Sequence, residues 1–162
     1  MRYIMVLSYF LFVGETPAAA QRLDIGGIEL YLGQGTGDAL RSLSAYTARY
    51  YDENQSWYVT QKVGTEYRLL GHFAATDGKI SFIAKRYHLA SEHDGARAYT
   101  QALRDAKKRG GASCQMRAVE GTDDLVHQIE TVCGSYRLSY FFPLQTDQGS
   151  AGAAVFVQVR AR

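Results

Sequence analysis

Residues 114–142 read CQMRAVEGTDDLVHQIETVCGSYRLSYFF, and this stretch decides the fold. Polar and apolar residues alternate in CQMRAV and in HQIETVC, which is the period of two that is typical of β-strands. The chain has two cysteines, Cys114 and Cys133. When the two are placed opposite each other in a hairpin, Arg117 faces Glu130, and such an opposite-charge pair across strands is favourable. The stretch therefore predicts a hairpin whose register brings the two sulfur atoms together.

The residues that follow Cys133 extend this hairpin into a meander. Gly134 and Ser135 form a two-residue turn signal with glycine first. The run SYRLSYFF then alternates until Pro143, a polar TDQGS segment predicts a loop, and AAVFVQVRAR closes the chain as another alternating run. Four antiparallel strands in a meander are therefore expected in the second half.

The first half has a similar order of elements. A short helix from about Thr36 to Ala45 precedes four alternating runs: TARYY, SWYVTQ, YRLLGHFAAT and KISFIAKRY. Asp77 and Gly78 separate the last two runs, and Asp-Gly between alternating runs predicts a type I′ hairpin turn.

A longer helix is expected between the two halves, in ASEHDGARAYTQALRDAKKRGG. Ser91 is a capping-type residue at its start, and Gly110 is the expected end. The expected apolar stripe at helical spacing is Ala96, Tyr99, Leu103 and Ala106. The basic residues of the last turn complement the helix dipole, so no nucleic-acid partner is needed to explain them.

The whole chain is therefore predicted to be α+β, with a mainly antiparallel sheet. Helix-then-four-strands occurs twice, in residues 26–88 and 91–162, which suggests pseudo-repeats. The alternative is one continuous sheet with both helices packed on a single face.

The first twenty residues have the plan of a secretory signal peptide: one basic residue, an apolar stretch over 3–13 and small residues at 18–20. The apolar stretch is shorter than the roughly 20 residues that span a bilayer, so no membrane span is expected in the mature chain. Residues 21–162 then form a single domain, which is expected in the periplasm or outside the cell. A buried N-terminal strand of a cytosolic protein is the alternative.

Export favours a disulfide between Cys114 and Cys133, because oxidising compartments allow such bonds to persist. A reactive thiol or a metal pair would need a Cys-x-x-Cys spacing or nearby histidines, and neither cysteine has them. The formal charge of +2 is too small to indicate nucleic acid.

The sequence lacks the established signatures of cofactor sites. In GGIELYLGQGTGDAL, Asp38 occupies the place of the third glycine in the dinucleotide fingerprint, and no P-loop lysine follows. His72, His88, His93 and His127 are scattered, without metal-ligand spacing. No cofactor, metal site or catalytic residue is therefore expected, although a catalytic site assembled from distant residues stays open.

Aromatic residues crowd one short segment, which includes Tyr50, Tyr51, Trp57 and Tyr58. Tyrosine and tryptophan on a sheet provide rigid contact area with a polar tip, which suits a protein or glycan surface. These four residues are the candidate binding surface, and ordinary packing is the alternative for each. Because side chains alternate along a strand, Trp57 and Tyr58 are expected on opposite faces.

The stretch IELYLGQGTGDAL also resembles a known pattern. Its I-x-L-x-L-G-x-x-x-x-x-A-L spacing is similar to the strand, turn and first helix of small exported α+β domains of the β-lactamase-inhibitor-protein and outer-membrane-assembly-lipoprotein type. The second half is similar to exported bacterial proteins of unknown function. The resemblance implies the fold and a tendency toward protein partners, and it carries over no catalytic residue.

Two functional hypotheses follow. The first is an exported, non-enzymatic module that binds an envelope protein or glycan through one face of its sheet. The second is a small periplasmic hydrolase or ligand-binding protein with a site assembled from dispersed residues. The sequence contains no signal for the oligomeric state.

Overall fold

The computed structural model of the protein describes residues 21–89, 94–120, 126–141, 144–146, 149–151 and 154–161. The predicted signal peptide, the predicted N-cap Ser91 and residues 121–125 lie outside these residues.

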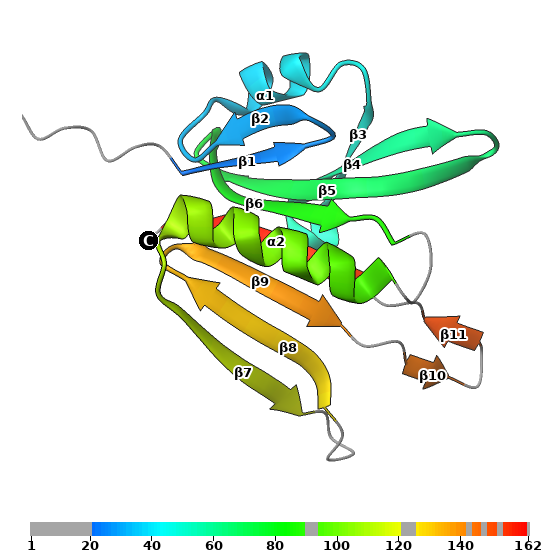
Figure 1. Cartoon of the computed structure of the whole chain (residues 1–162). Helices are drawn as coiled ribbons and strands as arrows, with labels where there is room; N and C mark the ends of the chain where they lie inside the picture. The colour runs from blue at the N-terminus through cyan, green and yellow to red at the C-terminus, as the bar shows by residue number, and fades with distance from the viewer. Residues whose placement is uncertain are drawn as a thin grey trace, which may run out of the picture.

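One eight-stranded antiparallel sheet forms the body of the molecule, in the order β3-β4-β5-β6-β12-β9-β8-β7 (Figure 1). The chain is α+β, as predicted. Its strands are β3 (Thr47–Tyr51), β4 (Ser56–Val63), β5 (Glu66–Thr76), β6 (Lys79–Tyr87), β7 (Cys114–Glu120), β8 (Val126–Cys133), β9 (Tyr136–Phe141) and β12 (Ala154–Arg160).

The last strand joins the two halves of the sheet. β12 pairs with β9 of its own meander and also with β6 of the first meander, with Val157 opposite both Leu138 and Lys85. The predicted alternative of one continuous sheet is therefore correct. Each half does follow the order of a helix and four strands, but a duplication of the unit remains a prediction.

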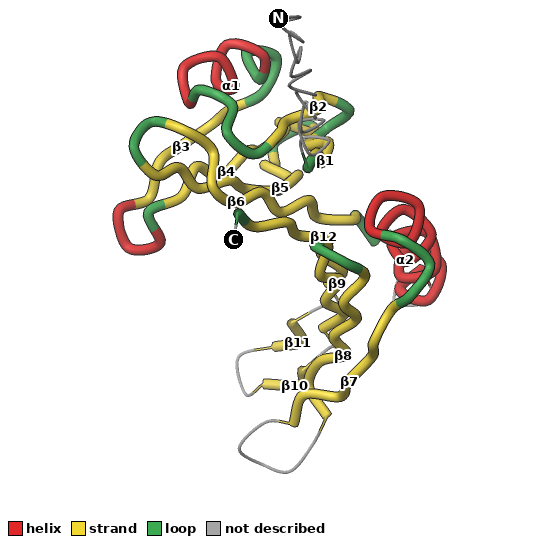
Figure 2. The backbone as a smooth tube through the Cα atoms, turned by 90° about the vertical axis from the view of Figure 1, so that its left-hand side faces the viewer, coloured by secondary structure: helices red, strands yellow, loops and turns green. Residues whose placement is uncertain are grey.

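A second layer covers one face of this sheet. It consists of the hairpin of β1 (Arg22–Ile25) and β2 (Ile28–Tyr31), the helix α1 (Thr36–Ser42) and the helix α2 (Asp94–Gly110). Figure 2 shows that the sheet bends between β12 and β9, and that α2 lies on the outer side of this bend. A short 3-10 helix, η1 (Asp52–Asn54), and a separate hairpin of β10 (Leu144–Thr146) and β11 (Gly149–Ala151) complete the described elements.

The hydrophobic core lies between the sheet and this second layer. Phe73, Ile83, Leu138 and Val157 come from four strands and are fully buried. They meet apolar side chains of the covering layer, among them Leu23, Ile25 and Leu30 of the hairpin and Ala98, Ala102 and Ala106 of α2. Alanines on α2 let the helix lie close to the strands beneath it.

The predicted stripe of α2 is correct for Ala106, Tyr99 and Leu103, which pack toward the core, and wrong for Ala96. The residues of α2 that are buried are Gly95, Ala98, Ala102 and Ala106, whereas Ala96 is exposed. Tyr99 and Leu103 flank the buried row and are half-buried. Alanine recurs on several sides of this helix, so the sequence alone does not fix which row faces the sheet.

The predicted TDQGS loop also differs from the structure. Thr146 ends β10 and Gly149 begins β11, so part of this segment lies in a small hairpin, with residues 147–148 outside the described part. The predicted turns are confirmed elsewhere: Asp77 and Gly78 have φ angles of 52° and 72°, as a type I′ turn requires.

Candidate functional site

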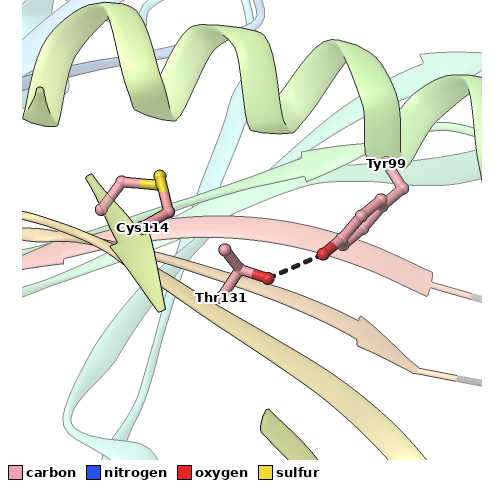
Figure 3. The surroundings of a disulfide bond; sticks show 4 residues. Tyr99, Cys114 and Thr131 are labelled. Atoms are coloured by element: carbon pink, nitrogen blue, oxygen red, sulfur yellow. Dashed lines mark hydrogen bonds between the residues drawn. A yellow bond between two sulfur atoms is a disulfide. The ribbon is translucent and has the colours of Figure 1, made fainter. Parts of the chain in front are cut away.

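The two cysteines form the predicted disulfide. Cys114 and Cys133 pair directly across β7 and β8, and their sulfur atoms are 2.03 Å apart. The predicted pairing of Arg117 with Glu130 is confirmed in the same register. Cys133 is fully buried, and Figure 3 shows the bond beneath α2, near Thr131 and Tyr99, whose hydroxyl groups are 2.7 Å apart. The disulfide therefore lies on the face that α2 covers.

The four predicted surface aromatics divide between the two faces of the sheet. Tyr50 packs on Trp57, with ring centroids 5.2 Å apart, and Trp57 stacks on the buried Phe73 at 6.4 Å. Tyr51 packs on Tyr58 at 5.1 Å on the opposite face. The four residues are therefore close in sequence, but the structure separates them into two pairs on opposite faces of the sheet.

We call the face that carries Phe73 and Leu138 the covered face, and the face that carries Tyr51 and Tyr58 the open face. Both helices and the β1–β2 hairpin lie on the covered face (Figures 1 and 2). The open face is on the inner side of the bend in the sheet (Figure 2).

The aromatic row on the open face continues across the sheet. Tyr58 stacks on His72 with centroids 5.0 Å apart, and His72 contacts the ring of Phe82 at 5.4 Å. The guanidinium of Arg160 lies over the Phe82 ring at 5.7 Å. Aromatic and cationic side chains are therefore held against each other from β4 to β12, which restricts their rotamers before any ligand arrives.

A second group of aromatics lies nearer the other end of the same strands. Arg86 lies 5.7 Å from the centroid of the Phe156 ring, and Phe156 packs edge-to-face on Phe141 at 6.0 Å. Phe141 remains 39% exposed. Cation–π contacts of this type order an arginine while leaving its donors available.

Basic side chains dominate the open face. The pairing register, together with the alternation of side chains along strands, places at least one on each of six strands: Arg49, Lys62, Lys79, Arg86, Arg160, Arg137 and Arg117. Among the side chains of the large sheet that the structure describes, Glu130 is the acidic residue that the register places on this face. The overall charge of +2 therefore conceals a strongly positive surface.

Glu130 is held by two of these arginines. Its side chain is 5% exposed, and it forms ion pairs with Arg117 and, at 3.0 Å, with Arg137. A carboxylate buried to this extent is stabilised by charge-assisted hydrogen bonds from two guanidinium groups. The excess of positive charge on this side of the sheet remains after Glu130 is counted.

His72 is at the centre of the aromatic row. Its Nδ1 atom is buried and has no hydrogen-bond partner. Burial lowers the pKa of the His72 imidazole below 6.5, because desolvation disfavours the charged form. The ring is therefore a neutral stacking partner at neutral pH.

A hollow of about 380 Å³ lies on the open face where β6, β12, β9 and the β8–β9 turn meet. Its polar lining comes from Arg137, Arg160, Gln158 and Ser135, and its apolar lining includes Phe82 and Val132. A second, shallower hollow lies between Arg49, Tyr51, Tyr58 and Tyr67.

Titratable side chains also meet on the covered face, but between packed elements. Lys85 of β6 donates to Asp24 of β1 at 2.6 Å, and Arg109 of α2 lies 3.9 Å from the same carboxylate. Nearby, the Tyr87 hydroxyl donates to Asp105 of α2, and burial together with this carboxylate raises the pKa of Tyr87. These contacts fasten the hairpin and α2 to the sheet.

The glycine-rich segment before α1 forms a turn. Gly35 is the N-cap of α1, and Gly33 donates its backbone N–H to the carbonyl of Ile80. Asp38 pairs with Arg41 within the helix. The described residues contain no cluster of three or more His, Cys, Asp or Glu side chains arranged for a metal ion.

No helix in the described part of the chain is long and apolar enough to cross a membrane. Comparisons with protein-family models, curated proteins and solved structures found no match.

The arginines of the open face were missed by sequence reasoning. Part of the signal was present, since the run SYRLSYFF alternates and Arg137 lies between Tyr136 and Leu138.

Proposed function

We propose that this protein is an exported, non-enzymatic binding module of the bacterial envelope, and that the open face of its sheet is the binding surface. One observation carries the proposal. The same eight strands have one face sealed by helices and a hairpin, while the other face displays ordered aromatic rings and arginines.

The composition of the open face supports a binding role. Tyrosine, phenylalanine and arginine are enriched at the centres of protein interfaces, whereas lysine and acidic residues are depleted there. The open face has five arginines and two lysines in the register, with Glu130 as its described acid. Tyr51 is 48% exposed, so part of this aromatic surface is accessible.

The dimensions of the face also fit. Strands are about 4.8 Å apart, so eight strands extend over about 34 Å. Three rows of side chains at alternate positions make the face about 20 Å deep. The resulting area, roughly 700 Å², is close to the about 800 Å² that each partner buries in a standard complex.

Export is supported by the plan of residues 1–20 and is compatible with the Cys114–Cys133 disulfide. The hydrolase alternative requires an acid–base group in a hollow. The contacts of Asp24 with Lys85 and of Tyr87 with Asp105 instead occur where α2 and the hairpin meet the sheet. This placement favours the binding module.

Site-specific crosslinking in the producing cell tests the proposal. A photoreactive phenylalanine analogue is placed at Tyr51 on the open face or, as the matched control, at Tyr31 on the β1–β2 hairpin; the two are 48% and 43% exposed. We expect a discrete crosslinked product from the Tyr51 position and none from Tyr31. A product from Tyr31 alone would place the partner on the covered side and overturn the proposal.

A further inference from the structure

The hollow beside Phe82 has the chemistry of a carboxylate site. We infer that it receives an aspartate or glutamate side chain of an acidic partner protein, an inference that rests on the proposed function of the open face. The site is distinct from the aromatic segment that the sequence singled out, since its residues come from β6, β8, β9 and β12.

Two arginines line this hollow from neighbouring strands, Arg137 from β9 and Arg160 from β12. Arg160 and Gln158 are two residues apart on β12 and therefore share a face. Gln158 is directly opposite Arg137 of β9, and Arg160 is directly opposite Phe82 of β6. A carboxylate placed between them receives donors from Arg137, Arg160 and the Gln158 amide, and guanidinium binds carboxylate in a bidentate manner.

Described acidic side chains balance the charge of the hollow only in part. Arg137 shares Glu130 with Arg117, whereas Arg160 has a cation–π contact and no ion pair among the described residues. None of the described residues that line the hollow is acidic. An incoming carboxylate therefore completes the charge balance.

Basic residues outside the hollow also favour an acidic partner. Arg49, Lys62 and Arg86 also have no ion pair within the described chain, and they extend the basic surface from the hollow toward the β3 edge of the sheet. A field of one sign over a concave face raises the encounter rate with partners of the opposite sign. The positive charge of the open face thus favours the approach of an acidic partner before its carboxylate enters the hollow.

A protein fits this surface better than an acidic polysaccharide. Tyr58 stacks on His72, His72 contacts Phe82 at a tilt of 41°, and Arg160 lies over the Phe82 ring, so neighbouring side chains occupy the faces of these rings. A sugar ring that stacks on an aromatic needs the exposed face. Rings next to arginines instead suit the packed centre of a protein interface.

The test uses two short peptides that differ in one charge, acetyl-Phe-Glu-Phe-amide and acetyl-Phe-Gln-Phe-amide. NMR of the arginine Nε–H groups follows each titration into the mature, disulfide-bonded chain. We expect the glutamate peptide to shift the Arg137 and Arg160 signals and to bind about tenfold more tightly than the glutamine peptide. Equal responses to the two peptides, or no response to either, would overturn the carboxylate site.

Variants and a sugar probe complete the experiment. Arg160→Gln should weaken the affinity for the glutamate peptide at least tenfold. Arg97→Gln, on the exposed side of α2, should leave this affinity unchanged. Equal losses in both variants would contradict a local site. Tetragalacturonate, compared at equal carboxylate concentration, should bind more weakly than the peptide; tighter binding would overturn the choice of a protein partner.

These outcomes are separable from failure of the proposed function. If the peptides fail while the Tyr51 crosslink persists, the open face still binds a partner and only the carboxylate site is wrong. If both experiments fail, the open face is not a binding surface.

Discussion

The covered and open faces of the sheet are built from the same eight strands, yet their side chains differ in burial and in charge. On the covered face, Phe73, Leu138 and Val157 are fully buried and contact the helices and the hairpin. On the open face, arginines lie over aromatic rings and retain unpaired charge. The difference shows that stability and recognition can be assigned to alternate residues of one strand.

The largest effect is expected from truncation on the covered face. Phe73→Ala removes a fully buried ring and should lower the free energy of unfolding by about 3–5 kcal/mol. Tyr51→Ala, the control on the open face, should change it by less than about 0.5 kcal/mol because Tyr51 is half exposed. Urea unfolding measures both. Comparable losses of unfolding free energy in the two variants would contradict the conclusion that the covered face carries the core and the open face does not.

The disulfide should have the next largest effect. Replacing both cysteines, as Cys114→Ser with Cys133→Ser, releases a chain constraint and should cost roughly 3 kcal/mol. Thermal unfolding under oxidising conditions compares this variant with the wild type. Addition of a reductant should destabilise only the wild type; a reductant effect in the variant would assign the stabilisation to something other than this bond.

A smaller loss is expected where the end of α2 meets the β8–β9 turn. In Gly110→Ala the new Cβ would lie 2.0 Å from the Cys133 carbonyl oxygen, and the required shift should cost about 1–3 kcal/mol. Gly37→Ala in α1 is the matched control, since its Cβ meets only Arg41 at 3.9 Å. That control should stabilise the protein by about 0.5–1 kcal/mol. A harmless Gly110→Ala would mean that α2 is not packed this closely.

The smallest effect concerns pH and the open face. The pKa of His72 is lowered by burial, so below pH 6.5 the unfolded chain takes up a proton that the folded chain refuses. The stability contributed by neutral His72 is present above pH 6.5 and is lost as pH falls toward the folded pKa. His72→Phe should flatten this part of the profile between pH 7 and pH 5. An identical slope in the variant would contradict the burial of His72.

Local patterns in the sequence predicted much of the sheet. The pairing of Arg117 with Glu130 across the disulfide hairpin and the turn at Asp77–Gly78 are confirmed, because both depend on residues close in the chain. The hairpin of β1 and β2 was not predicted, although Gly26 and Gly27 form its turn. Short strands of four residues give too little alternation to be distinguished from a loop.

The candidate site was harder to foresee. Arg137 and Arg160 belong to different strands, and only the pairing of β12 with both β9 and β6 brings them to one hollow. The clustering of Tyr50 and Tyr51 in sequence suggested one surface, whereas neighbouring residues of a strand point to opposite faces. Long-range pairing therefore determines the site, and composition does not reveal it.

Tyr50 and Tyr51 offer the most direct test of the central claim that the open face binds the partner. They are 46% and 48% exposed and lie next to each other in sequence on opposite faces. Tyrosine nitration of the protein in intact cells, compared with the purified chain and read by mass spectrometry, measures the protection of each ring. The account predicts that Tyr51 is protected in cells while Tyr50 reacts as in the purified protein; protection of Tyr50 with Tyr51 fully reactive would contradict it.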